Sequence, residues 1–258
     1  MEGVLAWEGK VGNARVRQLF DLQPVQASRL LAKFRAYMGN RLAEDTRMKV
    51  WRPVDHENMT PDLSLVEYAR IVDAADESCI VDARIDLTDI RPVLFAALRK
   101  AAVTNTGIAI TYASMSTPEF HERTIYPHSI VHVGRRWHVR AWCEKRQEFR
   151  DFTLGRIRNA VMTQMPSPVT KEIDGAWNRI VDIELAAHHK LDAQQQVVVE
   201  LEYFGGAKSR RISSRACLAQ YAIQELRAAT DPENDVPPEF QIEVLNFASL
   251  KADLFVAR

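Results

Sequence analysis

The spacing of apolar residues changes between about residues 102 and 108 of this 258-residue chain, and that change limits the folds open to it. Up to about residue 102, apolar residues recur every three to four positions, which is typical of amphipathic helices. From Ile108 to Leu154 they alternate with polar residues, which predicts short strands. We therefore expect an α+β, multidomain protein in which a helical N-terminal part precedes a β-rich middle.

The first 52 residues predict two helices and a hairpin. Asn13–Phe20 suits a short helix, and Pro24 suits the start of the next one because its missing N–H costs nothing there. The apolar stripe of this second helix consists of Ala27, Leu30, Leu31, Phe34 and Met38, and Gly39-Asn40 ends it. Arg41–Ala43 and Arg47–Trp51 then predict a strand-turn-strand.

This order of elements is that of a winged helix-turn-helix, in which one helix enters the DNA major groove. The predicted DNA-binding residues are Gln26, Ser28, Arg29 and Lys33 on the helix, with Arg47 and Lys49 on the hairpin. The alternative is an ordinary solvated helix with a basic face. Gln23 is a poor N-cap for this helix, and an additional first helix would have to fit into residues 1–7.

The middle of the chain predicts helices followed by a small antiparallel barrel. Ser64 and Glu67 have the spacing of a capping box and open a helix to about Ala75, and another helix is expected over Pro92–Ala102. The expected strands are Ile108–Tyr112, Ser129–Val133, Trp137–Cys143 and Glu148–Leu154.

The last third predicts a linker at Thr163–Thr170 and then a mixed α+β segment. The expected strands are Val197–Phe204, Arg210–Ser213 and Gln241–Leu245, with a helix near Ser214–Tyr221 and a loop at Asp231–Pro238. Gly205-Gly206 is interpreted as a hairpin turn.

The charges are balanced overall but separated along the chain. Lys and Arg number 34 and so do Asp and Glu, which at first argues against a nucleic-acid partner. By segment, however, the net charge is +5 over residues 1–52, −5 over 53–110, +4 over 111–160 and −4 over 161–258. Two basic segments therefore alternate with two acidic ones.

Composition excludes several classes of protein. With 47% hydrophobic and 26% charged residues, the chain is not expected to be disordered. The longest apolar run, Val93–Leu98, is far below the roughly 20 residues of a membrane span, and Met1–Val4 does not begin a signal peptide. Three scattered cysteines, Cys79, Cys143 and Cys217, favour a reducing, cytoplasmic location over a disulfide scaffold or a zinc site.

A motif in the β-rich segment resembles the WYL domain of bacterial transcription regulators. It comprises Tyr112-Ala-Ser-Met-Ser116, Arg123, Tyr126-Pro-His128 and Phe149-Arg-x-Phe-x-Leu-x-Arg-Ile157, while the name-giving Trp-Tyr-Leu triplet stands as Trp137-His138-Val139. Residues 181–226 are similar to the C-terminal extension of this family, including Leu185, His188 and Leu191. Residues 7–9 and 26–28 resemble the branch found beside phage-defence (BREX and CBASS) operons.

The resemblance implies an architecture and a function. It implies a winged helix-turn-helix over 1–54, a helical linker over 55–100, a WYL domain built as an Sm-like small β-barrel over 101–168, and an extension domain over 169–258. Members of this branch are homodimeric repressors, so the expected partner is an operator with an inverted repeat. By motif position the ligand pocket comprises Tyr112, Ser114, Ser116, His128, Arg150 and Arg156.

The pocket chemistry favours a nucleotide or single-stranded nucleic acid as effector. Arginine binds phosphate in bidentate fashion, hydroxyls add short hydrogen bonds, and aromatic rings stack on bases. The alternative is that Arg150 and Arg156 pair with acidic neighbours such as Asp151. A second function left open is a nucleic-acid-binding accessory module without operator specificity.

No catalytic residue, cofactor or metal site is predicted. His128 and His132 lie in a strand pattern that does not bring them together, and His188-His189 is interpreted as a solvated turn. The sequence has neither a glycine-rich phosphate-binding motif nor a nucleophilic triad. We therefore do not expect an enzyme.

Overall fold

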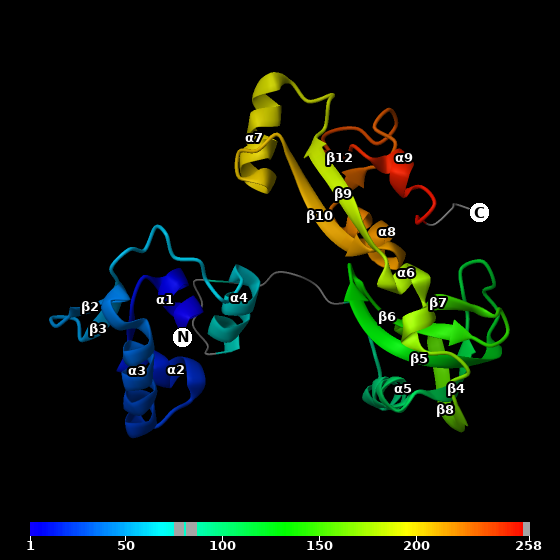
Figure 1. Ribbon diagram of the computed structural model, residues 1–258, viewed down its shortest axis with the longest axis horizontal. Coiled ribbons are helices and arrows are strands. Elements are labelled where there is room, and N and C mark those ends of the chain that lie inside the picture. Colours follow the sequence, from blue (N-terminus) through cyan, green and yellow to red (C-terminus); the bar gives the residue numbers. More distant parts are fainter. Residues whose placement is uncertain (75–79, 81–86, 255–258) are drawn as a thin grey trace. The chain divides into compact units, whose positions relative to one another are not determined.

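The computed structural model describes residues 1–74, 80 and 87–254. The chain divides into two compact units, Met1–Ile85 and Asp86–Arg258, each of which is considered by itself (Figure 1). Cys79, one of the three cysteines in the sequence, lies outside the described residues.

The first unit contains the predicted helices and hairpin. Its elements are α1 (Glu2–Glu8), β1 (Val11–Gly12), α2 (Asn13–Phe20), α3 (Pro24–Met38), a 3-10 turn (Gly39–Arg41), β2 (Leu42–Asp45), β3 (Val50–Pro53) and α4 (Leu65–Ala74). The three strands form one sheet in the order β1-β3-β2. The short helix expected within residues 1–7 is therefore present as α1.

The apolar stripe of α3 is buried as predicted. Ala27, Phe34 and Met38 are buried, and they join Leu5 of α1 and Val16 of α2 in one core. At the start of α3, the Gln23 N–H donates to Gln26 Oε1 at 3.0 Å. The weak N-cap is thus supported by a reciprocal side chain of the kind found in capping boxes.

The hairpin differs from the prediction by a few residues. Its strands begin later, so Arg47 and Lys49 lie in the turn between β2 and β3. Asp45 causes this placement, because its Oδ1 accepts the Met48 N–H at 3.0 Å and its Oδ2 accepts Arg52 Nε at 3.1 Å. Lys49 has φ of +55°, a value that closes the turn.

The helix predicted from the capping-box spacing is α4. Glu67 accepts hydrogen bonds from the Ser64 backbone and hydroxyl at 3.0 and 2.7 Å. The expected end at Ala75 lies outside the described residues. Trp7 Nε1 donates to the Leu63 carbonyl at 2.8 Å, so the segment before α4 is held against α1.

The second unit begins with a helix on a five-stranded sheet. Its elements are α5 (Pro92–Thr104), β4 (Thr106–Tyr112), β5 (His121–Val133), β6 (Arg136–Cys143), β7 (Glu148–Thr153), a 3-10 turn (Leu154–Arg156) and β8 (Ile157–Pro166). The sheet order is β7-β6-β5-β4-β8, and all neighbours are antiparallel. Among the described residues, β7 and β8 are edge strands, so hydrogen bonds do not close the sheet into the predicted barrel.

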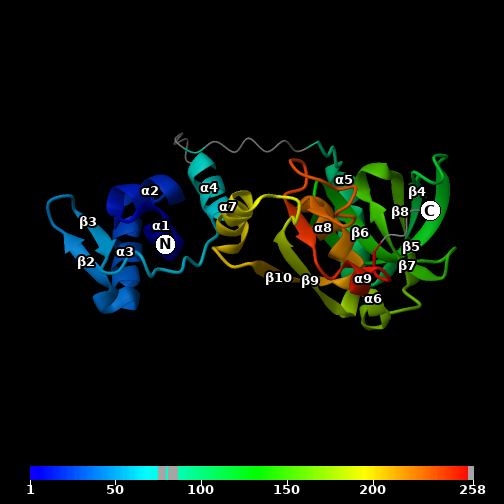
Figure 2. The ribbon, with the colours of Figure 1, turned by 90° about the horizontal axis from the view of Figure 1, so that it is seen from above.

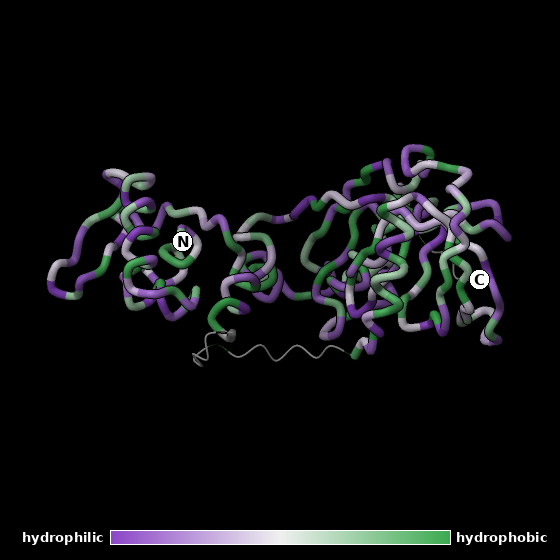
Figure 3. Tube along the Cα trace, turned by 90° about the horizontal axis from the view of Figure 1, so that it is seen from below, coloured by the Kyte–Doolittle hydropathy of each residue, from purple (hydrophilic) through white to green (hydrophobic). Residues whose placement is uncertain are grey.

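The apolar core of this sheet follows the predicted alternation. Val139, Ala141 and Cys143 of β6 face a core that also includes Leu98 of α5 and Ile125 of β5. Figure 3 colours the trace by hydropathy and shows hydrophobic and hydrophilic residues interspersed along the chain. The intervening residues of β6, His138 and Arg140, therefore lie on the opposite face.

One β-strand of this sheet is longer than predicted, and another, β8, was not predicted. β5 begins at His121 rather than Ser129, and a register shift between Pro127 and Ser129 interrupts its alternation. β8 extends to Pro166 and includes half of the predicted linker at 163–170. Because β8 is an edge strand, Val161 and Met165 remain exposed, and the sequence pattern there is weak.

The rest of the second unit packs around a four-stranded sheet (Figure 2). Its elements are α6 (Gly175–Asn178), β9 (Ile180–Ala187), α7 (Ala193–Phe204), β10 (Ser209–Arg215), α8 (Ala219–Glu225), β11 (Ala228–Ala229), β12 (Ile242–Val244) and α9 (Phe247–Leu250), with 3-10 turns at Lys171–Ile173 and Ala216–Leu218. The sheet order is β10-β9-β12-β11.

The strand predicted at Val197–Phe204 is wrong, because these residues form most of α7. Asp192 accepts the N–H groups of Gln194 and Gln195, both at 2.9 Å, and Gly205 ends the helix in the left-handed conformation with φ of 64°. Gly205-Gly206 is accordingly a helix end and not a hairpin turn.

The other C-terminal predictions are corrected in detail. The strands at 210–213 and 241–245 are present as β10 and β12, whereas β9 was not predicted. The helix expected from Ser214 begins at Ala219 as α8, because Ser214 and Arg215 still pair with β9.

We expect Leu98→Ala to lower the free energy of unfolding by about 2–5 kcal/mol, because Leu98 is fully buried between α5 and the sheet. Val103→Ala on the same helix is the matched control, since Val103 is 68% exposed. Urea denaturation of both variants measures the difference. Equal stability of the two variants would contradict the packing of α5 described above.

Candidate functional site

Four of the predicted DNA-binding residues in the first unit are cations exposed to solvent. Arg29 and Lys33 lie on α3, and Arg47 and Lys49 lie in the β2–β3 turn. Within the described part of the chain none of the four side chains has an ion-pair partner. They are therefore available to bind phosphates or base edges.

The other two predicted residues position the helices. Ser28 Oγ accepts a hydrogen bond from Asn13 Nδ2 at 2.7 Å, and Asn13 also donates to the Pro24 carbonyl at 3.2 Å. These bonds join the start of α2 to the start of α3. Gln26, as described above, supports the N-terminus of α3 through its side-chain oxygen.

Arg35 joins α3 to the hairpin. Its guanidinium lies 3.9 Å from the ring centroid of Trp51 on β3, within the range of a cation–π interaction. The orientation of the hairpin relative to α3 therefore depends on a contact that the sequence pattern did not reveal.

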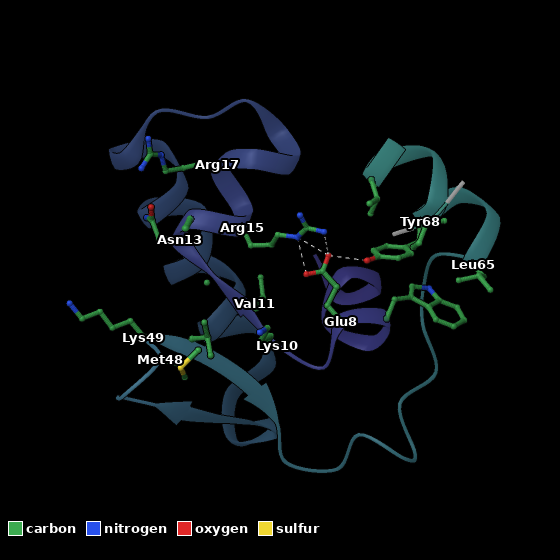
Figure 4. A pocket seen from close by; sticks show the side chains of 16 residues that line it. Glu8, Lys10, Val11, Asn13, Arg15, Arg17, Met48, Lys49, Leu65 and Tyr68 are labelled. Carbon is green, nitrogen blue, oxygen red and sulfur yellow. Dashed lines mark hydrogen bonds and ion pairs between the residues drawn. The ribbon is translucent and has the colours of Figure 1, made fainter. Parts of the chain in front are cut away.

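A cavity of about 890 Å³ lies beside these elements in the first unit. Figure 4 shows Glu8 at its centre, where Arg15 donates to both carboxylate oxygens at 2.7–2.9 Å and the Tyr68 hydroxyl donates at 3.1 Å. Lys10, Arg17 and Lys49 also line the cavity. Lys10 and Arg17 are cations near the helix-hairpin region that sequence reasoning did not select.

A second cavity, of about 650 Å³, lies in the second unit, and we call it the WYL-motif cavity. Four of the six predicted ligand-binding residues line it: Tyr112, Ser114, Ser116 and Arg150. Ser114 Oγ lies 3.2 Å from Ser116 Oγ and accepts the Thr117 N–H at 3.0 Å. The loop after β4 therefore presents a group of hydroxyls to the cavity.

The cavity is more basic than predicted. Arg123, Arg140 and Arg146 line it together with Arg150, and Arg123 Nε is buried without a hydrogen-bond partner in the described structure. Arg150 does pair with an acidic neighbour, but with Glu148 at 3.1 Å rather than with Asp151. Both groups of that pair are at least 40% exposed, so it contributes little and leaves Arg150 free to bind another anion.

Arg140 is held in a buried ion pair beside the cavity. Its Nε and Nη2 donate to Asp174 at 2.7 and 3.0 Å, and its Nη1 donates to Asp151 at 3.3 Å. Burial would raise the pKa of Asp174, but the hydrogen bonds from His128 and Arg140 hold it well below its ordinary value. Burial raises the pKa of Asp151, and the charge of Arg140 opposes that rise.

His128 is not among the residues that line this cavity. Its side chain is 6% exposed, its Nε2 lies 3.2 Å from Asp174 Oδ2, and its ring packs edge-on against Trp177. The residue therefore helps to hold Asp174. Sequence reasoning missed this role because the contact joins positions 46 residues apart.

The C-terminal part of the chain forms one side of the WYL-motif cavity. Cys217 and Tyr221 line it from the 3-10 turn and α8, and Asp253 and Leu254 line it after α9. Tyr221 donates to Asp151 of β7 at 3.4 Å. Any ligand in this cavity would therefore contact both the sheet and the C-terminal segment.

Arg156 is also absent from the cavity lining, and it lies near His138 instead. His138 is 4% exposed, and its ring centroid lies 4.7 Å from that of Tyr221. Burial, followed by the charges of Arg136 and Arg156, lowers the pKa of His138 to about 4. The imidazole is therefore neutral at pH 7.

The interpretation of His188-His189 as a solvated turn is wrong for His188, which is fully buried. His188, His189 and Glu243 bring potential ligand atoms within 4.8 Å of one another. His188 Nε2, however, donates to the Asp235 carbonyl at 2.8 Å, and His188 Nδ1 accepts the Lys190 N–H at 3.1 Å. Because both ring nitrogens have partners, we assign no metal to this group.

Two families match separate parts of the second unit. The WYL domain matches residues 93–162, and the family described as "BrxR transcriptional regulator, C-terminal dimerization domain" matches residues 180–250. Among the described residues, no helix has the length and apolar character needed to cross a membrane.

Curated relatives extend over nearly the whole chain. The chain is 27% identical to the "DNA-binding transcriptional repressor CapW" of Stenotrophomonas maltophilia over 96% of this chain and 87% of that protein. It is 28% identical to the repressor of the same name from Escherichia coli, over 94% and 85%. A solved structure of the proteasome accessory factor PafBC of Arthrobacter aurescens matches 71% of this chain and 28% of that chain with 14% identity and a TM-score of 0.30, too low to support a conclusion.

We expect stability to fall below neutral pH because of His138. The unfolded chain binds a proton on this residue near its ordinary pKa of 6.5, whereas folded His138 does so only near pH 4. The unfolded state therefore takes up more protons between these values, and about 2 kcal/mol of stability is lost between pH 7.5 and 5. Urea unfolding of the wild type and of His138→Phe at both pH values measures this. An identical pH dependence in the two proteins would contradict the prediction.

Proposed function

Since this chain joins a WYL domain to a BrxR-type C-terminal dimerization domain, we propose that it is a DNA-binding transcriptional repressor controlled by a ligand of the WYL domain. The observation that carries this proposal is the similarity to repressors over at least 94% of the chain, which includes the N-terminal unit. Repressors are not enzymes. A repressor acts on chromosomal DNA, so we place the protein in the bacterial cytoplasm.

The first unit is the proposed DNA-binding domain, a winged helix-turn-helix. In this assignment α3 enters the major groove, Arg29 and Lys33 contact bases or phosphates, and Arg47 and Lys49 of the hairpin turn contact the backbone. The bonds that Asn13 makes to Ser28 and Pro24 support this role, because they fix the angle between α2 and α3.

The proposed assembly is a homodimer on an inverted repeat. α7 lies within the matched dimerization domain and exposes Val197, Val198 and Leu201, which are between 47% and 64% accessible. An exposed apolar helix face of this kind is suited to a second copy of the chain. The operon that it controls would be a phage-defence operon, as the resemblance of residues 7–9 and 26–28 implies.

The proposed effector is a nucleotide or a short single-stranded nucleic acid in the WYL-motif cavity. Arg123, Arg146 and Arg150 would bind phosphates, the hydroxyls of Ser114 and Ser116 would add hydrogen bonds, and Tyr112 or Phe149 would stack on a base. Because both the sheet and α8 line the cavity, a ligand that fits one arrangement of these parts better would shift their population. That shift would change the spacing of the two α3 helices in the dimer.

We expect Arg29→Ala with Lys33→Ala to weaken operator binding at least tenfold, because two charge-assisted contacts to DNA are lost. Arg99→Ala with Lys100→Ala on α5 is the charge-matched control and should bind as the wild type does. A gel shift on the upstream region of its own operon at fixed salt measures both. Unchanged binding by the α3 variant would contradict the assignment of α3.

The same assay distinguishes the repressor from the second candidate function, an accessory module without operator specificity. The separated basic segments keep this candidate open, since charge alone supports non-specific binding. A repressor binds the operator far more tightly than a random duplex at the same salt. Equal affinity for the two duplexes would favour the accessory module.

We expect Arg150→Ala to leave operator binding intact and to abolish derepression, because it removes a cation that lines the cavity but lies outside the DNA-binding unit. Lys145→Ala, an exposed cation in the preceding turn, is the control. A reporter fused to the operator measures repression and its release, and a thermal-shift assay with short DNA oligonucleotides measures binding. Loss of operator binding by Arg150→Ala would instead assign the residue a structural role.

A further inference from the structure

A smaller cavity, of about 110 Å³, lies between the β5–β6 turn and α8. Its lining includes Arg135 from the β5–β6 turn, Arg136 and His138 from β6, and Gln224 and Glu225 from α8. Tyr221 lines both this cavity and the WYL-motif cavity, so one tyrosine ring lies next to both spaces.

His138 lines this smaller cavity as a buried polar group that lacks a partner. The residue is 4% exposed, and in the described structure neither ring nitrogen has a hydrogen-bond partner. Arg140, on the same face of β6, is fully paired by Asp174. Buried polar groups in folded proteins are nearly always hydrogen-bonded, so an unpartnered imidazole at a cavity is a group that a bound anion would satisfy.

The charges around this imidazole are predominantly positive. Arg135 and Arg136 are exposed at the cavity, and Arg156 acts on His138 from the turn after β7. Within the described residues, no carboxylate forms an ion pair with any of these three arginines. Glu225 of α8 is the acidic group in the lining, and it offsets only part of this charge.

We propose that this smaller cavity is a phosphoryl-binding subsite, in which Arg135 and Arg136 bind the anion and His138 donates a hydrogen bond to it. Guanidinium groups bind tetrahedral oxyanions in bidentate fashion, and a space of this size accommodates such an anion. The subsite does not depend on DNA binding. The anion is either free phosphate or a second phosphate of an effector held in the adjoining cavity.

Binding at this subsite is coupled to a proton. The groups that face His138 are Arg136 on its own strand, Arg156 in the turn after β7, and Tyr221 and Glu225 on α8. Without an anion, burial and the two arginines keep the imidazole neutral. An anion next to the imidazole favours its protonated form and so opposes both burial and the arginine charges. His138 therefore takes up a proton on binding, and the affinity rises as the pH falls.

Calorimetric titration of the full-length protein with inorganic phosphate, against chloride at equal ionic strength, tests the subsite. Arg135→Gln with Arg136→Gln should weaken phosphate binding at least tenfold, and these exposed substitutions should not affect folding. Arg99→Gln with Lys100→Gln controls for loss of charge. The proposal is overturned if the control weakens binding equally, or if only Arg150→Gln in the other cavity weakens it.

Sulfate tests the role of His138, because the sulfate ion, unlike phosphate, keeps the same charge between about pH 6 and 8. The wild-type affinity for sulfate should rise severalfold over this range as the pH falls, and His138→Tyr should remove the rise. The same pH dependence in both proteins overturns the assignment of His138.

A short oligonucleotide with or without a 5′-phosphate then identifies the source of the anion. If the 5′-phosphate raises the affinity and the Arg135→Gln, Arg136→Gln variant loses this gain, the effector is the source of the anion. If the 5′-phosphate does not raise the affinity, the anion is free phosphate. Because phosphate binding is measured without operator DNA, failure of the repressor assignment would leave this result unaffected.

Discussion

The second unit depends on the buried ion pair between Arg140 and Asp174. Arg140 lies on the face of β6 opposite its apolar core, and Asp174 immediately precedes α6, where it also accepts the Trp177 N–H at 3.1 Å. Both side chains are less than 10% exposed, so loss of either partner would leave an unpaired buried charge at a cost of about 3–5 kcal/mol. The pair therefore holds the start of the C-terminal segment against the sheet, beside the WYL-motif cavity.

This arrangement places the five-stranded sheet and the C-terminal segment on two sides of one cavity. The sheet and its loops contribute the serine hydroxyls and the arginines, while Cys217 and Tyr221 come from the C-terminal segment. Tyr221 donates to Asp151, which also accepts from Arg140, so the boundary between the two parts is a continuous polar network. In such a network the loss of one member is costly, because it leaves a buried partner without a hydrogen bond.

The sequence predicted those features that are encoded locally. The stripe of α3 and the alternation in β4 and β6 were predicted correctly because each repeats within one element. The prediction failed for α7, where three consecutive valines suggested a strand, although Asp192 and Gly205 mark the two ends of a helix. The sequence pattern did not reveal the contacts of His128 and Arg140 with Asp174, because Asp174 lies 46 and 34 residues away and only the tertiary structure brings it near. Four of the six expected pocket residues line one cavity, since the motif places them on neighbouring strands and loops.

The zero net charge takes on a different meaning once the cations are sorted by their contacts. Arg15, Arg35 and Arg140 are engaged within the protein, by Glu8, Trp51 and Asp174 respectively. Arg29 and Lys33 on α3, and Arg135 and Arg136 beside His138, have no ion-pair partner in the described structure and are exposed. Acidic residues elsewhere bring the net charge of the chain to zero, but they do not neutralise these four cations. Exposed charges separated by more than about 10 Å are screened from one another by salt. The cations that remain unpaired therefore decide whether a chain of this kind binds anions. The total charge of the chain does not reveal which cations these are.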